Sequence, residues 1–137
     1  DTIQHIKPEV STICVGFAAS AAAILLSAGE KGNRYALPNS EIMIHQVLGS
    51  AEGQAVDIKI SADHIVHIRE KINKIFSKHT LQPLAKIERD TDRDFYMDPL
   101  DAKTYGIVDH IIKSKNGTNL IGAKEEHKAI REKVLTK

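Results

Sequence analysis

Three kinds of side chain that act together in nucleophilic catalysis occur near the ends of predicted elements in this sequence. Ser20 supplies a hydroxyl and His45 supplies an imidazole. A hydroxyl is a weak nucleophile until a base takes its proton, and an imidazole does this well when a carboxylate fixes its tautomer. Three carboxylates follow at alternate positions: Asp90, Asp92 and Asp94. The residue types therefore allow acyl transfer through a Ser-His-Asp triad, with the choice of aspartate left open.

Each of these residues also has a simpler interpretation. A serine among alanines often lets two helices pack closely, and a histidine at a strand end is often a core or surface residue with one satisfied nitrogen. The aspartates are interleaved with Arg89 and Arg93, a pattern typical of a solvated turn or a salt-bridged helix end. Only the combination of all three residue types favours catalysis.

Other groups of polar residues give weaker indications. One predicted helix carries four residues that could bind a metal ion, Asp63, His64, His67 and Glu70, but no further ligand follows at a recognisable spacing. A solvated helix face is the favoured interpretation, and we expect no metal. The glycines form neither GxGxxG nor a P-loop, so we expect no nucleotide or other cofactor on this chain.

Composition narrows the function classes further. The 137 residues are enough for one core, and 19 Lys and Arg balance 18 Asp and Glu to a net charge of +1. This balance argues against nucleic acid or an acidic membrane as a partner. The single Cys14 lies in an apolar segment, can form no intrachain disulfide and is expected to be a buried thiol in a reducing compartment. There is no apolar run of membrane-spanning length in these residues, and we expect no signal peptide.

The elements that must position the candidate residues follow from the apolar pattern. We predict a buried strand over 10–15, and then a helix that starts in the alanine-rich stretch from Ala18, has Ser20 near its N-terminus and runs to about Ala28. Two further strands, 35–37 and 41–45, are separated by a turn. Strand, helix and strand in this order predict an α/β fold with parallel strands covered by helices and functional groups at their carboxyl ends.

A long helix is predicted over 54–78, with apolar residues at intervals of three and four. This stripe consists of Ile58, Ala62, Ile65, Ile68, Ile72 and either Ile75 or Phe76. So long a helix is expected to extend beyond its own core and to offer part of its stripe to another subunit. The alternative is that it simply crosses the domain.

The remaining chain reads as short elements followed by a tail. We predict helices over 82–90 and 98–106, with Asp98 as the N-cap and Gly106 as the terminator, and a strand over 107–112. A polar linker over 114–118 precedes a charged helix over 123–135. We expect one domain over 1–113 and a tail over 114–137.

Several segments, taken in order, resemble the proteolytic subunits of the Clp protease, the ClpP family of serine peptidases. The resemblance covers about residues 1–113 and rests on long motifs: Gly16-Phe-Ala-Ala-Ser20, Ala36-Leu-Pro-Asn-Ser40, Ile42-Met-Ile-His-Gln46, Gly53-Gln-Ala55, Ile87-Glu-Arg-Asp-Thr-Asp-Arg-Asp94 and Ala102-Lys-Thr-Tyr-Gly106. It implies a crotonase-like α/β fold in which the long helix is a protruding handle.

The resemblance also implies roles for individual residues. Ser20 would be the nucleophile, His45 the general base and Asp94 the orienting acid, with the backbone N–H of Ala21 serving the oxyanion. The segment after His45 would lie beside the substrate as an extra strand, with Leu48 as the best single position for that contact. A further pair, Asp92 with Arg93, would make a contact between subunits.

Assembly and partners are implied as well. Subunits of the family form heptameric rings stacked into a tetradecameric barrel, in which unfolded polypeptides are cut to short peptides. A hexameric ATP-driven unfoldase of the Hsp100 (AAA+) class would feed the chamber, and ATP would bind that partner. The compartment would be a bacterial cytoplasm, or the stroma or matrix of an organelle.

Departures from the family pattern keep alternatives open. Ser20 is followed by Ala21 and Ala22, where the family usually has methionine and a small residue. The family's N-terminal region, with its axial loops and the glycine-rich turn that gives a second oxyanion donor, has no counterpart here. The main alternative is a non-catalytic structural subunit of a mixed ring, and a more remote one is an acyl-CoA enzyme of the same fold.

Overall fold

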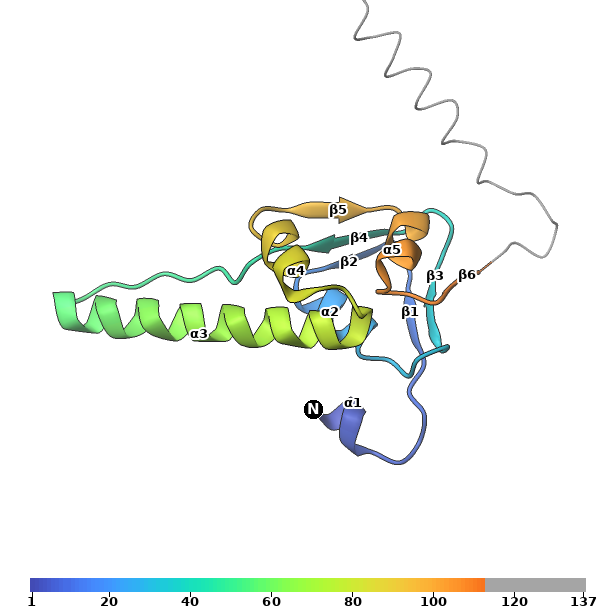
Figure 1. The fold of residues 1–137 in the computed structure, drawn as a ribbon, viewed down its shortest axis with the longest axis horizontal. Helices are drawn as coiled ribbons and strands as arrows, with labels where there is room; N and C mark the ends of the chain where they lie inside the picture. Colours follow the sequence, from blue (N-terminus) through green and yellow to red (C-terminus); the bar gives the residue numbers. More distant parts are fainter. Residues whose placement is uncertain (113–137) are drawn as a thin grey trace, which may run out of the picture.

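The computed structural model describes residues 1–112, and these form a mixed α/β domain (Figure 1). In chain order the elements are α1 (Thr2–His5), β1 (Thr12–Cys14), β2 (Phe17–Ala19), α2 (Ala21–Ser27), β3 (Arg34–Ala36), β4 (Glu41–Ile44), α3 (Ala55–Thr80), α4 (Leu84–Asp90), β5 (Phe95–Met97), α5 (Pro99–Tyr105) and β6 (His110–Ile111). The predicted tail over 114–137 lies outside the described residues.

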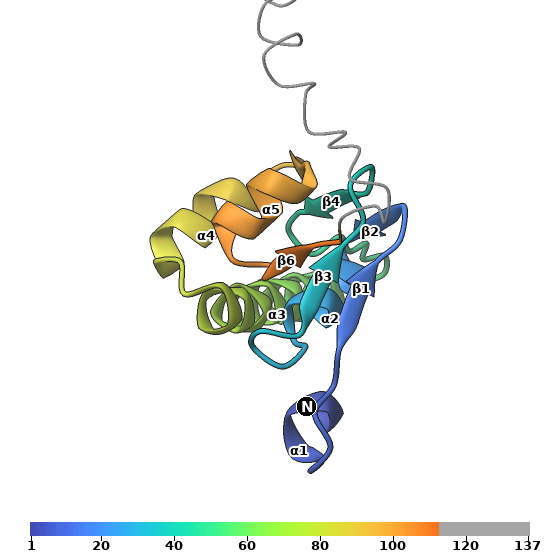
Figure 2. The ribbon, with the colours of Figure 1, turned by 90° about the vertical axis from the view of Figure 1, so that its right-hand side faces the viewer.

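The strands of residues 1–112 form two three-stranded sheets. The first has the order β1-β3-β6 with parallel pairs throughout. The second has the order β2-β4-β5, in which β2 and β4 are parallel and β5 is antiparallel to β4. Figure 2 shows the first sheet with its strands side by side and α3 seen end-on. The predicted α/β class with parallel strands covered by helices is confirmed.

The chain passes from the first sheet to the second at two adjacent corners. At one corner Gly16 has φ +84°, a conformation that a side chain would strain. Its carbonyl accepts a hydrogen bond from the Glu41 N–H at 2.7 Å, which joins it to the other corner. The strands predicted over 35–37 and 41–45 are both present, but the turn between them places β3 and β4 in different sheets.

Two strands were not predicted. Helix was expected from Ala18 onward, yet Phe17–Ala19 is β2, and α2 begins only at Ala21. Alanine favours helix locally, but hydrogen bonding to β4 decides the conformation here. Strand β5 follows directly after a polar turn and is three residues long, too short to show an alternating pattern.

Other predicted bounds were close. The predicted cap of α5 is confirmed, since Oδ1 of Asp98 accepts the N–H groups of Leu100 and Asp101 at 2.8 Å each. Gly106 ends this helix with φ +95°. The strand predicted over 107–112 is limited to β6, because the N–H groups of Ile107 and Val108 donate to the carbonyl of Ala102 in α5 at 2.9 and 3.5 Å.

The core lies between the sheets and the helices. It contains residues from nearly every element: Cys14, Ala18, Ala23, Leu26, Ala36, Ile42, Ile44, Phe76, Ile87, Met97, Ala102, Tyr105, Ile107 and Val108. As predicted, the Cys14 thiol is buried, and burial raises its pKa. No helix within residues 1–112 is long and apolar enough to cross a membrane.

Helix α3 extends well past the body of the domain (Figure 1). Its 26 residues give a length of about 39 Å. Its buried residues, Asn73, Phe76 and Thr80, all lie near its C-terminal end, whereas Val56 and Ile60 are 68% and 62% exposed. The prediction that this helix extends beyond its own core is confirmed.

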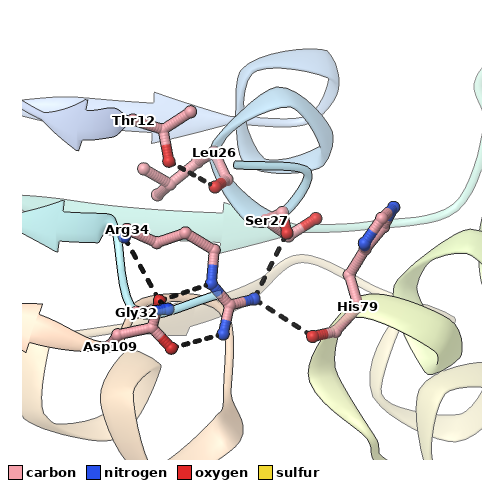
Figure 3. A network of polar contacts seen from close by, with 7 residues as sticks. All are labelled: Thr12, Leu26, Ser27, Gly32, Arg34, His79 and Asp109. Carbon is pink, nitrogen blue, oxygen red and sulfur yellow. Dashed lines mark hydrogen bonds and ion pairs between the residues drawn. The ribbon is translucent and has the colours of Figure 1, made fainter. Parts of the chain in front are cut away.

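A buried ion pair fastens the C-terminal end of α3 to the first sheet (Figure 3). Nε and Nη2 of Arg34 donate to the two carboxylate oxygens of Asp109 at 2.8 and 2.6 Å. Nη1 of Arg34 donates to the carbonyls of Ser27 and His79, so the guanidinium joins α2, α3, β3 and the segment before β6. The Arg34 hydrogen bonds lower the pKa of Asp109 to about 2.

Candidate active site

Ser20 stands between strand β2 and helix α2, as an exposed N-cap with φ 54° and ψ −118°. Positive φ is unfavourable for a residue with a Cβ and is typical of functional turns. The Ser20 N–H donates to the carbonyl of Met43 at 3.0 Å, and its carbonyl accepts from Ala23 and Ile24. The backbone around the hydroxyl is therefore held from both sides.

Strand register brings the three predicted residues to the same end of the second sheet, after β2, after β4 and before β5. Ala19 is the register partner of Met43, and each is followed within two residues by a candidate, Ser20 and His45. On the other side of β4, Ile44 pairs with Phe95 in the antiparallel ladder. Continuing that ladder by one position sets His45 opposite Asp94.

The His45 imidazole and the Asp94 carboxylate lie next to each other. Nδ1 of His45 is 3.6 Å from Oδ1 of Asp94, in ion-pair range but longer than an N–H···O hydrogen bond. The imidazole is largely buried, with 12% of its side chain exposed, while the Asp94 side chain is 56% exposed. The nitrogen that faces Asp94 is the one a triad requires, because it leaves Nε2 for the hydroxyl.

The structure separates the three aspartates that the sequence left open. The Asp90 carboxylate accepts from Lys86 Nζ at 2.7 Å and from the Tyr105 hydroxyl at 3.0 Å. Burial raises its pKa, but these two hydrogen bonds together with the charges of Lys86 and Arg89 outweigh burial, and the pKa of Asp90 is lowered overall. The Asp92 carboxylate lies 3.9 Å from Arg93 Nε, with both side chains exposed. Among the three, Asp94 is the one paired with His45.

The Ala21 N–H sits where an oxyanion donor is expected. Ala21 is the first residue of α2, directly after Ser20. The first N–H groups of a helix have no partner within the helix and can donate to an oxyanion. Its role as a donor stays a prediction.

Leu48 and the Asp92–Arg93 pair lie on the surface. Leu48 is 79% exposed, in the coil between β4 and α3. A Cβ on the next residue, Gly49, would collide with the side chain of Ile65, so the coil passes close to α3. Substrate contact for Leu48 and subunit contact for Asp92 and Arg93 stay predictions.

The alternative metal site on α3 finds no support in residues 1–112. No group of three or more potential ligands is close enough there to hold a metal ion. The Asp63 carboxylate instead accepts from Lys59 Nζ at 2.6 Å on the exposed face of the helix.

Two polar residues around the site, Asn73 and Thr91, were given no role from the sequence, and Gln46 was named only as the start of the segment expected beside the substrate. Nε2 of Gln46 donates to the carbonyl of Asp92 at 2.8 Å. The Thr91 hydroxyl lies 3.2 Å from Oδ1 of Asn73, and both residues are buried. A signal was present for Asn73, a polar residue within the apolar stripe of α3. The position of Gln46 directly after the candidate base His45 also indicated a polar residue close to the site.

A family model described as Clp protease matches residues 1–115. The match spans most of the 137 residues and includes every residue of the candidate site. The chain therefore belongs to the Clp protease family and is a Clp-type peptidase.

Proposed function

We propose that this chain is the proteolytic subunit of an ATP-dependent Clp protease and acts as a serine endopeptidase on unfolded polypeptides. The observation that carries the proposal is the 3.6 Å contact between Nδ1 of His45 and Oδ1 of Asp94. This contact lies at the same end of the second sheet as the strained turn that carries Ser20. Family membership supplies the chemical class, peptide-bond hydrolysis.

In the proposed acylation step, Oγ of Ser20 attacks the carbonyl carbon of the scissile peptide while Nε2 of His45 takes the hydroxyl proton. Asp94 holds Nδ1–H of the imidazole and stabilises its positive form. The Ala21 N–H donates to the developing oxyanion. When the C–N bond breaks, the imidazolium gives its proton to the amine that leaves, and an acyl-enzyme on Ser20 remains.

In the proposed deacylation step, water replaces the hydroxyl in the same roles. Nε2 of His45 takes a proton from a water molecule while the oxygen of that water attacks the acyl carbon. The bond to Oγ of Ser20 then breaks, and the proton passes back to that oxygen. The products are a carboxylic acid and the free serine, so one peptide bond consumes one water.

We further propose assembly into stacked heptameric rings served by a hexameric AAA+ unfoldase. The exposed apolar residues on the projecting part of α3 support this assembly, because the side chains of Val56 and Ile60 stay more than half exposed in residues 1–112. ATP hydrolysis belongs to the unfoldase in this proposal. The rival role, a structural subunit without activity, predicts the same assembly without reaction at Ser20.

Covalent labelling separates the two roles. We expect the assembled wild-type protein to react with a fluorophosphonate probe at Ser20 and to cleave a fluorogenic peptide. The variant Ser20→Ala should lose both properties, and His45→Ala should lose most of both. An assembled wild-type particle that takes up no label would contradict the peptidase proposal and favour the structural subunit.

A further inference from the structure

The turn that carries Asp94 is anchored at its start by a buried polar contact. The Thr91 hydroxyl lies 2.8 Å from the carbonyl of Ile87 and 3.2 Å from Oδ1 of Asn73 on α3, and its one proton is shared between these two acceptors. Thr91 and Asn73 are 1% and 2% exposed. The beginning of the turn is therefore fixed to the long helix, whereas the residues that follow, 92–94, are all exposed.

A second contact joins the middle of the turn to the chain beside the imidazole. Nε2 of Gln46 donates to the carbonyl of Asp92 at 2.8 Å. Gln46 directly follows His45, and Asp92 lies two residues before Asp94. This side-chain hydrogen bond thus connects the segment that contains His45 to the turn that contains Asp94.

The pairing of β4 with β5 holds the chain on the other side of His45 and Asp94. Ile44, directly before His45, is the register partner of Phe95, directly after Asp94. The imidazole and the carboxylate are therefore bracketed by a strand pairing on one side and by the Gln46 contact on the other. Apart from the Gln46 contact, the exposed part of the turn is held by its ends, by a long hydrogen bond from the Asp92 N–H to the Arg89 carbonyl at 3.4 Å and by the exposed Asp92–Arg93 pair.

We propose that Gln46 is a positioning residue that holds the turn so that the Asp94 carboxylate stays within reach of Nδ1 of His45. This inference rests on the proposed function. An ion pair at 3.6 Å with a carboxylate that is 56% exposed contributes little on its own to fixing the turn. The position of Asp94 must therefore come from the backbone, and Gln46 is the side chain that holds that backbone at Asp92.

The chain offers a matched control for this glutamine. Nε2 of Gln4 also donates to a main-chain carbonyl, that of Ala28, at the same 2.8 Å. It belongs to α1, away from the triad. The variants Gln46→Leu and Gln4→Leu thus each remove one hydrogen bond of the same type and length. A second matched pair, Gln46→Glu and Gln4→Glu, keeps the side-chain shape but replaces the amide donor by a charged carboxylate, in case leucine disturbs folding.

The experiment measures peptide cleavage, fluorophosphonate labelling and melting temperature on the full chain in its assembled form. For Gln46→Leu and Gln46→Glu we expect kcat and the labelling rate to fall about ten- to hundredfold, because a small misplacement of a catalytic group has effects of that size. KM should stay within about twofold of wild type, because the Gln46 hydrogen bond affects the chemical step and not substrate binding. The melting temperature should match that of the corresponding Gln4 variant.

Two results would overturn the inference while leaving the proposed function intact. One is a kcat for both Gln46 variants equal to that of the Gln4 variants. The other is a change confined to KM, which would make Gln46 a substrate contact instead. A wild-type particle without label at Ser20 would instead overturn the proposed function, and this inference with it.

Discussion

The Ser20 N–H donates to the carbonyl of Met43 at 3.0 Å, so the candidate nucleophile is held by the strand that leads to the candidate base. This contact extends the pairing of β2 with β4 by one residue, at the point where the chain turns into α2. The turn requires φ 54° at a residue with a side chain. The hydroxyl is thus presented at the cost of backbone strain.

That strain gives a stability prediction that is independent of activity. A positive φ at a non-glycine residue costs about 1–3 kcal/mol, and glycine avoids most of it while losing somewhat more chain entropy on folding. We expect Ser20→Gly to be more stable than Ser20→Ala by up to about 2 kcal/mol, measured by urea unfolding. Both variants lack the hydroxyl, so activity does not confuse the comparison. Equal stability, or a less stable glycine variant, would show that the turn is unstrained.

The pairing of His45 with Asp94 gives a prediction on the rate. In Asp94→Asn the amide keeps the size of the side chain but removes the charge that stabilises the imidazolium. We expect kcat to fall by about 10²–10⁴-fold with the melting temperature unchanged, since the side chain is largely exposed. The control is Glu88→Gln, which neutralises an exposed carboxylate on α4 and should leave kcat unchanged. Equal activity of the two variants would remove Asp94 from the mechanism.

The strand that leads to His45 and two of the helices could be predicted because their signals are local. The strand over 41–45 and the long helix are marked by apolar periodicity, and Asp98, Pro99 and Gly106 specify a helix start and stop through their own backbone preferences. The strand at Phe17–Ala19 was missed because its conformation depends on a partner strand distant in sequence. Local preference cannot reveal such pairing.

The choice of Asp94 among three aspartates illustrates the same limit within the site. All three lie in one short segment that also holds Arg89 and Arg93, and their surroundings differ only after folding. Asp90 meets Lys86 and Tyr105, while the ladder from Ile44 to Phe95 brings Asp94 to His45. From the residue types alone the three were equivalent, and only the resemblance to a family separated them.

The projecting part of α3 gives a prediction on assembly. Val56 and Ile60 are exposed by more than half on this part of the helix, and an apolar surface of this kind is expected to pack against another copy. We expect Ile60→Lys to shift stacked rings toward single rings in sedimentation velocity. The control is Glu70→Lys, which places lysine at an exposed polar position of the same helix. If both variants sediment like wild type, the projecting apolar residues do not hold the rings together.

The buried pair of Arg34 and Asp109 gives a prediction on acid stability (Figure 3). The folded pKa of Asp109 is about 2, below the ordinary value of 3.8, so its contribution is complete above about pH 4 and is lost as the pH falls toward 2. That difference corresponds to about 2 kcal/mol. Urea unfolding between pH 2 and pH 7 should therefore show a decrease in stability over this range that is smaller in Asp109→Asn.

An exposed ion pair provides the control for this comparison. Lys59 Nζ and the Asp63 carboxylate are also 2.6 Å apart, but both side chains are more than two thirds exposed, against 5% and 16% for Arg34 and Asp109. At pH 7 we expect Asp109→Asn to lose at least about 2 kcal/mol, the contribution of the Asp109 charge, and Asp63→Asn to lose no more than about 0.5 kcal/mol. Similar losses in the two variants would mean that burial does not set the strength of the Arg34 pair.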